Sequence, residues 1–234
     1  MKPLLAALSS AALLAASSVM HGDAEVSPAN RLYEQAVVES ERASKLERRG
    51  KMRPAIDAYE LAGRLSEASL AEAERTGISE DDRPVEVYFR CATSYLHAGR
   101  LLARERGDEE RREDDLTKAT TYLETVEKIE TDRARQANKP INPEIWRVRN
   151  AAGYACFLRG ELAQARLHYG AVLQMNPSYR PAEQAISEIN KLEQEQNELF
   201  TPQGKTLQKE KTRAVLKGVV ETLRLVRDIV TLGR

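Results

Sequence analysis

The sequence predicts an all-α protein, built as a short series of helical hairpins. Ala, Leu, Glu and Arg dominate the composition, whereas aromatic residues make up only 5% of it. Unbranched side chains of this kind lose little rotamer freedom in a helix. The apolar and polar alternation of a strand is almost absent, and Gly or Pro separates the apolar segments at short intervals. With 41% hydrophobic and 31% charged residues, the composition is that of a globular protein with a hydrophobic core.

Seven helical segments are expected between the two ends of the chain. Their expected stops include Gly50, Gly77, Gly99 and Gly160, since Gly readily adopts the left-handed conformation that ends a helix. The charged passage 104–115, RERGDEERREDD, is either an ordered loop or a helix extension, and a solvated face is expected by default for such a run. The expected helical segments are 27–50, 53–77, 82–99, 116–137, 142–160, 162–176 and 180–199.

Residues 1–23 differ from the rest and are interpreted as a secretory signal peptide. One Lys precedes an apolar run from Leu4 to Ala16, and Ala15 and Ser17 suit the small-residue positions of a cleavage site. The run is short for a membrane span; an N-terminal membrane anchor is the alternative. The mature protein would begin between residues 18 and 24 and is expected to be periplasmic, and possible attachment to a membrane is left open.

The segment RNAAGYACFLRGELAQARLHYGAVLQMNPSY, residues 149–179, resembles a tetratricopeptide repeat. This helix-turn-helix unit has small and bulky residues at fixed offsets. Less regular units are found over 36–63, with Gly50 as the turn, and from Tyr88 onward, with Gly99 as the turn. The resemblance implies a helical repeat domain over 24–199, with about three repeats and a capping helix. The repeat-packing residues are Gly153, Gly160, Leu162, Ala165, Tyr169 and Pro177.

The sequence offers no constellation typical of catalysis, and we expect no cofactor and no metal. His97 and His168 have no ligand-type residue one turn further on, so groove or surface positions are expected for both. Cys91 and Cys156 form either a disulfide or two buried thiols; their different positions in the repeat frame favour the thiols. Lys plus Arg equals Asp plus Glu, at 36 each, so we expect no nucleic-acid partner.

The resemblance also implies a partner-binding groove lined by the first helix of each repeat. Its aromatic and aliphatic character suits an apolar or helical segment of a partner protein. The alternative is that Tyr154 and Phe157 are buried against the flanking helix, because helical aromatic residues often belong to a core. The groove residues are Glu86, Phe89, Thr93, Leu96, His97, Arg147, Asn150, Tyr154, Phe157 and Leu158.

Residues 200–234 are expected to form a hinge, at 201–204, followed by a basic amphipathic helix. The segment from Gly204 to Arg234 has eight Lys or Arg and three Asp or Glu. This helix would cap the last repeat, lie in the protein's own groove, pair with a partner helix or rest on an anionic membrane. Its apolar seam, with spacings of three and four residues, consists of Leu216, Val219, Leu223, Val226 and Val230.

Together these features predict a non-catalytic adaptor in a bacterial-type cell envelope. Exported members of the family that it resembles commonly serve secretion, pilus, motility or outer-membrane assembly machines, so a protein of such a machine is the expected partner. Two alternatives stay open: a peripheral membrane protein attached through the C-terminal helix, and an activator of a cell-wall enzyme. The oligomeric state is left open.

Overall fold

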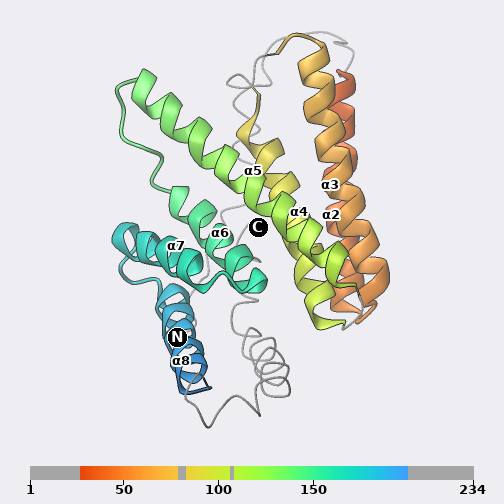
Figure 1. Cartoon of the computed structure of the whole chain (residues 1–234). Helices are drawn as coiled ribbons and strands as arrows, with labels where there is room; N and C mark the ends of the chain where they lie inside the picture. The colour runs from red at the N-terminus through yellow and green to blue at the C-terminus, as the bar shows by residue number, and fades with distance from the viewer. Residues whose placement is uncertain (1–26, 79–82, 106–107, 200–234) are drawn as a thin grey trace, which may run out of the picture.

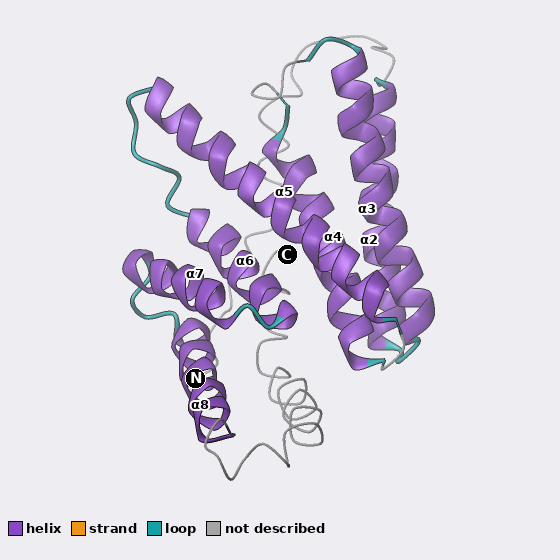
Figure 2. Cartoon of the chain, viewed as in Figure 1, coloured by secondary structure: helices purple, strands orange, loops and turns teal. Residues whose placement is uncertain are grey.

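A computed structural model of the chain describes residues 27–78, 83–105 and 108–199, and these residues form helices joined by turns (Figure 2). The all-α prediction is confirmed for this part, which contains no strand. The residues of the predicted signal peptide and of the predicted C-terminal helix lie outside it. The helices are α2 (Pro28–Arg48), α3 (Met52–Arg75), α4 (Val85–Arg104), α5 (Glu109–Gln136), α6 (Ile145–Arg159), α7 (Leu162–Met175) and α8 (Arg180–Leu199).

Each helix packs against the next one along the chain (Figure 1). The first two, α2 and α3, lie side by side as a hairpin, and α4 and α5 cross beside them. In addition, α2 contacts α4 and α4 contacts α6, so alternate helices also touch. Contacts of this kind between near neighbours are typical of helical repeat architectures.

Three of the four predicted glycine stops are confirmed. Gly50, Gly77 and Gly160 have φ of 73°, 82° and 80°, in the left-handed region. At each turn the glycine N–H and the following N–H donate to carbonyls of the preceding helix; for example, Lys51 N–H bonds to the carbonyl of Leu46 at 3.0 Å. Glycine is suited to this position because it carries no Cβ to clash.

The predicted stop at Gly99 is wrong. Gly99 is buried inside α4, which continues to Arg104. A Cβ at Gly99 would lie 2.8 Å from two side-chain carbons of Leu116 on α5. Gly99 therefore allows α4 and α5 to approach each other closely, and it does not form a turn.

The charged passage 104–115 is mostly helical. Asp108 caps α5 by accepting a hydrogen bond from the backbone N–H of Arg111 at 3.1 Å, and the helix begins at Glu109. Of the two alternatives left open for this passage, the helix is found for 109–115, and the acidic first turn suits the positive end of the helix dipole.

The hairpins differ in length from the expected repeats. The first one runs from Pro28 to Arg75, well beyond the expected unit at 36–63. Gly63, the expected end of that unit, lies in the middle of α3, where a Cβ would be 2.7 Å from the ring of Tyr95. Only the α6 and α7 hairpin, from Ile145 to Met175, matches the length expected from the resemblance.

In that hairpin, small residues let two helices approach closely. A Cβ at Gly153 of α6 would lie 3.2 Å from His168 Cβ and from the Tyr169 ring on α7. Ala165 and Tyr169 are buried there, and Leu162 packs against the same cluster. Pro177 is exposed in the turn before α8. Gly153 therefore lies where α6 and α7 approach closely, and the Tyr169 ring lies against it within the same hairpin.

Three hydrophobic clusters follow one another along the series of helices. One joins α2, α3 and α4, a large central one joins α3 to α6, and the third joins α6, α7 and α8. Helix α6 is buried on nearly all sides because it lies between α5 and α7 and also touches α4. Across the described ranges, no helix is both long and apolar enough to cross a membrane.

Candidate functional site

The predicted binding face is partly open on α4. Glu86 is exposed, and Phe89, Thr93 and His97 are half-buried, one or two turns apart on the helix. The Thr93 hydroxyl donates to the carbonyl of Phe89 at 2.9 Å. Leu96 is buried in the central cluster. The accessible part of this face is therefore a short strip with one carboxylate, one aromatic ring, one hydroxyl and one imidazole.

On α6 most of the predicted groove residues are buried. Arg147 is exposed and pairs with Glu144 at 2.6 Å. The other four, listed last, are no more than 8% exposed and belong to the protein interior. A partner would reach them only if a neighbouring helix moved, so their placement favours the core alternative for this half of the face. These residues are Asn150, Tyr154, Phe157 and Leu158.

An ion pair with little solvent exposure lies at the edge of the α4 strip. Arg100 Nη2 on α4 donates to both carboxylate oxygens of Glu47 on α2, at 2.8 Å each. The Tyr59 hydroxyl of α3 donates to the same carboxylate at 3.2 Å. The rings of Tyr59 and His97 stack with centroids 4.8 Å apart, and His97 Nδ1 lies 3.3 Å from Arg100 Nη2. Three helices are thus joined through one carboxylate.

The charge state of this group is fixed by its own members. Burial acts to raise the pKa of Glu47, but the charge and hydrogen bond of Arg100 outweigh it, and the pKa is lowered from its ordinary value. Burial likewise acts to lower the pKa of Arg100, and Glu47 reverses this effect. Since both groups stay ionised at neutral pH, the pair is a structural connection between α2 and α4.

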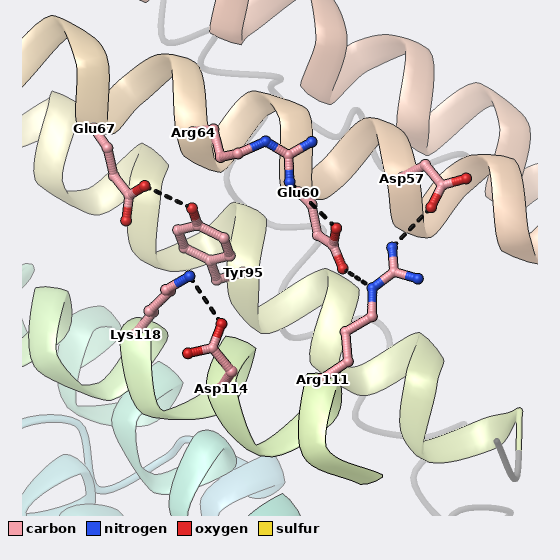
Figure 3. A network of polar contacts seen from close by, with 8 residues as sticks. All are labelled: Asp57, Glu60, Arg64, Glu67, Tyr95, Arg111, Asp114 and Lys118. Carbon is pink, nitrogen blue, oxygen red and sulfur yellow. Dashed lines mark hydrogen bonds and ion pairs between the residues drawn. The ribbon is translucent and has the colours of Figure 1, made fainter. Parts of the chain in front are cut away.

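A second polar network joins α3, α4 and α5 (Figure 3). Arg111 of α5 lies between two carboxylates of α3, with its Nε donating to Glu60 and its Nη2 to Asp57 at 2.8 Å. Arg64 pairs with the other oxygen of Glu60 at 3.4 Å. The hydrogen bonds from Arg111 to Glu60 and then to Asp57 hold the pKa of Arg111 above its ordinary value, although burial acts to lower it. The start of α5 is thereby fixed to α3.

The same network continues through two tyrosines that share one acceptor. The hydroxyls of Tyr95 and Tyr122 donate to separate oxygens of Glu67, at 2.8 Å and 3.1 Å. Lys118 lies 5.0 Å from the centroid of the Tyr95 ring and pairs with Asp114 at 2.8 Å. Figure 3 shows Tyr95 between Glu67 on α3 and Lys118 on α5. Tyr95 occupies the space that a side chain at position 63 would fill.

Asp115 is a buried carboxyl with an unsatisfied oxygen. It is 3% exposed, and no hydrogen-bond partner is present for its Oδ2 among the described residues. Burial, and then the charge of Glu60, raises the pKa of Asp115 to about 8, although Arg111 and Lys118 act in the opposite direction. The carboxyl is therefore largely protonated at neutral pH. The sequence gives no sign of this, because Asp115 stands there as one of many charged residues in the passage 104–115.

Sequence analysis missed an aromatic pair at the start of α6. The rings of Trp146 and Tyr179 have centroids 4.7 Å apart, and the Arg147 guanidinium lies 5.5 Å from the Trp146 ring. Both rings are partly exposed and pack against the α6 to α8 cluster. The signal that could have found this pair is an aromatic residue at the start of α6 and another directly before α8, the two helices that flank α7 along the chain.

Cys91 and Cys156 are free, buried thiols, so the disulfide alternative is not found. Burial raises the pKa of both, that of Cys156 to about 11. His168 is half-buried on α7, and burial lowers its pKa. In the helices and turns that the structure describes, no group of three or more His, Cys, Asp or Glu is placed to hold a metal ion. The predicted C-terminal seam, from Leu216 to Val230, lies outside the described residues.

Comparisons with known proteins add no relative: no protein-family model matches this chain, and no curated protein matches it.

Proposed function

We propose that this chain is a non-catalytic adaptor of the cell envelope that binds a segment of another protein on its α4 surface. The observation that carries this proposal is the contact of alternate helices, α2 with α4 and α4 with α6. These contacts, in which α4 touches both α2 and α6, support a layer formed by the first helices of successive repeats. Phe89, Thr93 and His97 are partly exposed on α4.

The proposal includes a fold of the tetratricopeptide type. Its three repeats would be α2 with α3, α4 with α5, and α6 with α7, and α8 would cover the apolar side of the last one. The packing of Gly153 against His168 and Tyr169 and the left-handed turn at Gly160 support this assignment. Two longer hairpins precede the repeat of regular length. The export signal and the periplasmic location remain part of the proposal on the strength of residues 1–23.

Binding to the α4 strip is tested with two matched charge introductions. Phe89→Glu places a carboxylate on the strip, whereas Leu167→Glu places one on α7, where Leu167 is 67% exposed. The full-length protein is expressed in bacteria, partners are captured after mild crosslinking and identified by mass spectrometry, and capture is repeated with both variants. We expect Phe89→Glu to lose a partner that Leu167→Glu retains. Equal capture by the two variants at unchanged helicity would refute the α4 strip as the binding site.

A further inference from the structure

The turn between α2 and α3 carries an unusual concentration of positive charge. Within KLERRGKMR, residues 45–53, five basic side chains accompany a single acidic one. All five basic residues are exposed, and the turn lies at one end of the molecule (Figure 1). We call this set the basic tip; it consists of Lys45, Arg48, Arg49, Lys51 and Arg53.

Nearby carboxylates neutralise little of this charge. Glu47, the acid within the tip, turns inward and is bound by Arg100 and Tyr59. Arg53 pairs with Glu105 at 3.4 Å, while its side chain stays 88% exposed. Among the described residues, Lys45, Arg49 and Lys51 form no ion pair. The basic tip therefore has a strong net positive charge, although the chain as a whole has none.

Acids at the start of α5, at the same end of the molecule, are mostly engaged with their own helix. Asp108 accepts from the backbone N–H of Arg111, and Glu109 pairs with Arg112 at 3.1 Å. Their charges are thus partly offset before they can act on the basic tip.

Backbone hydrogen bonds fix the turn that carries these charges, and no apolar side chain of the turn points outward between them. Gly50 N–H bonds to the carbonyl of Glu47 at 2.9 Å and Lys51 N–H to that of Leu46 at 3.0 Å, which closes the turn. Leu46 and Met52, the apolar residues between the cations, pack inward against the α2 to α4 cluster. The outer surface of the tip is consequently cationic, with long, flexible side chains.

We propose that the basic tip binds an anionic membrane surface through the phosphates of lipid headgroups. A cluster of exposed Lys and Arg is attracted to anionic lipids with a gain that grows with each cation. A docked peptide would instead use apolar pockets between its charged contacts, and here Leu46 and Met52 face inward. A nucleic-acid site would extend along a stripe of phosphates, whereas these cations are confined to one turn. This membrane contact is independent of the protein-binding strip on α4.

The test is flotation of the full-length chain with vesicles of mixed phosphatidylglycerol and phosphatidylcholine, compared with vesicles of phosphatidylcholine alone. The tip variant combines Lys45→Gln, Arg48→Gln, Arg49→Gln and Lys51→Gln. A control variant removes the same number of positive charges from exposed positions elsewhere and combines Lys128→Gln, Arg135→Gln, Lys139→Gln and Arg180→Gln.

We expect the wild type to float with the anionic vesicles and to be released at high salt. The tip variant is expected to bind at least about tenfold more weakly, since each cation near an anionic surface adds to the attraction, and the control variant is expected to bind like the wild type. Circular dichroism checks that both variants are folded. Equal flotation of all three proteins, an equal loss in both variants, or no flotation of the wild type would overturn the proposal. So would tip-dependent binding to an acidic polypeptide or to RNA without binding to vesicles.

Discussion

Glu47 on α2 and Asp115 on α5 are carboxylates with little exposure, and their surroundings shift their pKa values in opposite directions. Glu47 has a direct cationic partner in Arg100 and keeps its charge, whereas Asp115 has an oxygen without a partner and a raised pKa. The difference decides how each residue contributes to stability, because a buried charge is tolerated only when it is paired and hydrogen-bonded.

Replacing Asp115 by Asn should stabilise the protein at neutral pH. In the folded state the pKa of Asp115 is raised to about 8, so folding is penalised once the pH exceeds the ordinary carboxyl pKa of about 3.9, and the penalty grows until about pH 8. We expect the variant to gain about 1 to 3 kcal/mol of unfolding free energy at pH 7. Urea unfolding followed by circular dichroism from pH 4 to pH 8, a range set by the same linkage, measures the gain.

The control for this prediction is Asp114→Asn, which changes the neighbouring carboxyl. Asp114 is exposed and pairs with Lys118 on the surface, so its loss should alter stability by less than about 1 kcal/mol. A gain for Asp115→Asn that stays the same at acidic pH would show that the carboxyl is not protonated in the folded protein.

Replacing Glu47 by Gln should have the opposite effect. Arg100 would be left as a buried cation without its partner, and breaking such a pair costs about 3 kcal/mol. Because the pKa of Glu47 is lowered, its stabilisation is complete above the ordinary carboxyl range and is lost as the pH falls through the lowered value. The difference between wild type and variant should thus shrink on acidification. Glu41→Gln, at an exposed position of the same helix, is the matched control.

At the scale of helices, glycines that all look like helix stops in the sequence have two different structural roles. Gly50, Gly77 and Gly160 end helices with positive φ, and the sequence identified all three. Gly99 lies within a helix and touches Leu116 of α5, a residue seventeen positions further on. The local pattern at Gly99 contains no trace of this contact, since it is set by how α4 and α5 cross. Helix ends could therefore be predicted from sequence and helix crossings could not.

The same limit applies to the candidate site. Phe89 and Phe157 were predicted together because they belong to the same family-derived surface, yet one is half-buried and the other is 5% exposed. Helix α6 contacts neighbours on several sides, and its exposure depends on α5 and α7 more than on its own pattern. The ion pair of Glu47 and Arg100 could likewise not be predicted from local spacing, because the two residues are fifty-three positions apart.

Replacing Gly99 by Ala should destabilise the protein even though Ala favours a helix over Gly by about 1 kcal/mol. The new Cβ would lie 2.8 Å from two side-chain carbons of Leu116, which is fully buried, so the Leu116 side chain would have to shift within the core. We expect a net loss of about 1 to 3 kcal/mol, typical of overpacking. Chemical denaturation of Gly99→Ala, Leu116→Ala and the double variant measures the coupling between the two positions. The double variant should lose less unfolding free energy than the sum of the losses in the two single variants. A stabilising Gly99→Ala would mean that α4 and α5 are less closely packed.

For the whole molecule, the order of the three clusters along the chain predicts that damage stays local. Ile189 belongs to the cluster of α6 to α8, and Ile56 to the cluster of α2 to α4; both are almost fully buried. Repeat architectures transmit stability mainly between neighbouring units. Ile189→Asp should therefore increase hydrogen exchange in α7 and α8 while α2 and α3 stay protected, and Ile56→Asp should do the reverse.

Hydrogen exchange followed by mass spectrometry, with peptides from each helix, distinguishes this behaviour from a single cooperative unit. Helix α6 is the informative element, because it contributes to both the central cluster and the last one. If Ile189→Asp exposes α6 together with α7 and α8, the boundary of the local unit lies between α5 and α6. If the two variants raise exchange equally in every helix, the central cluster couples the ends, and the chain unfolds as one body rather than as a series of hairpins.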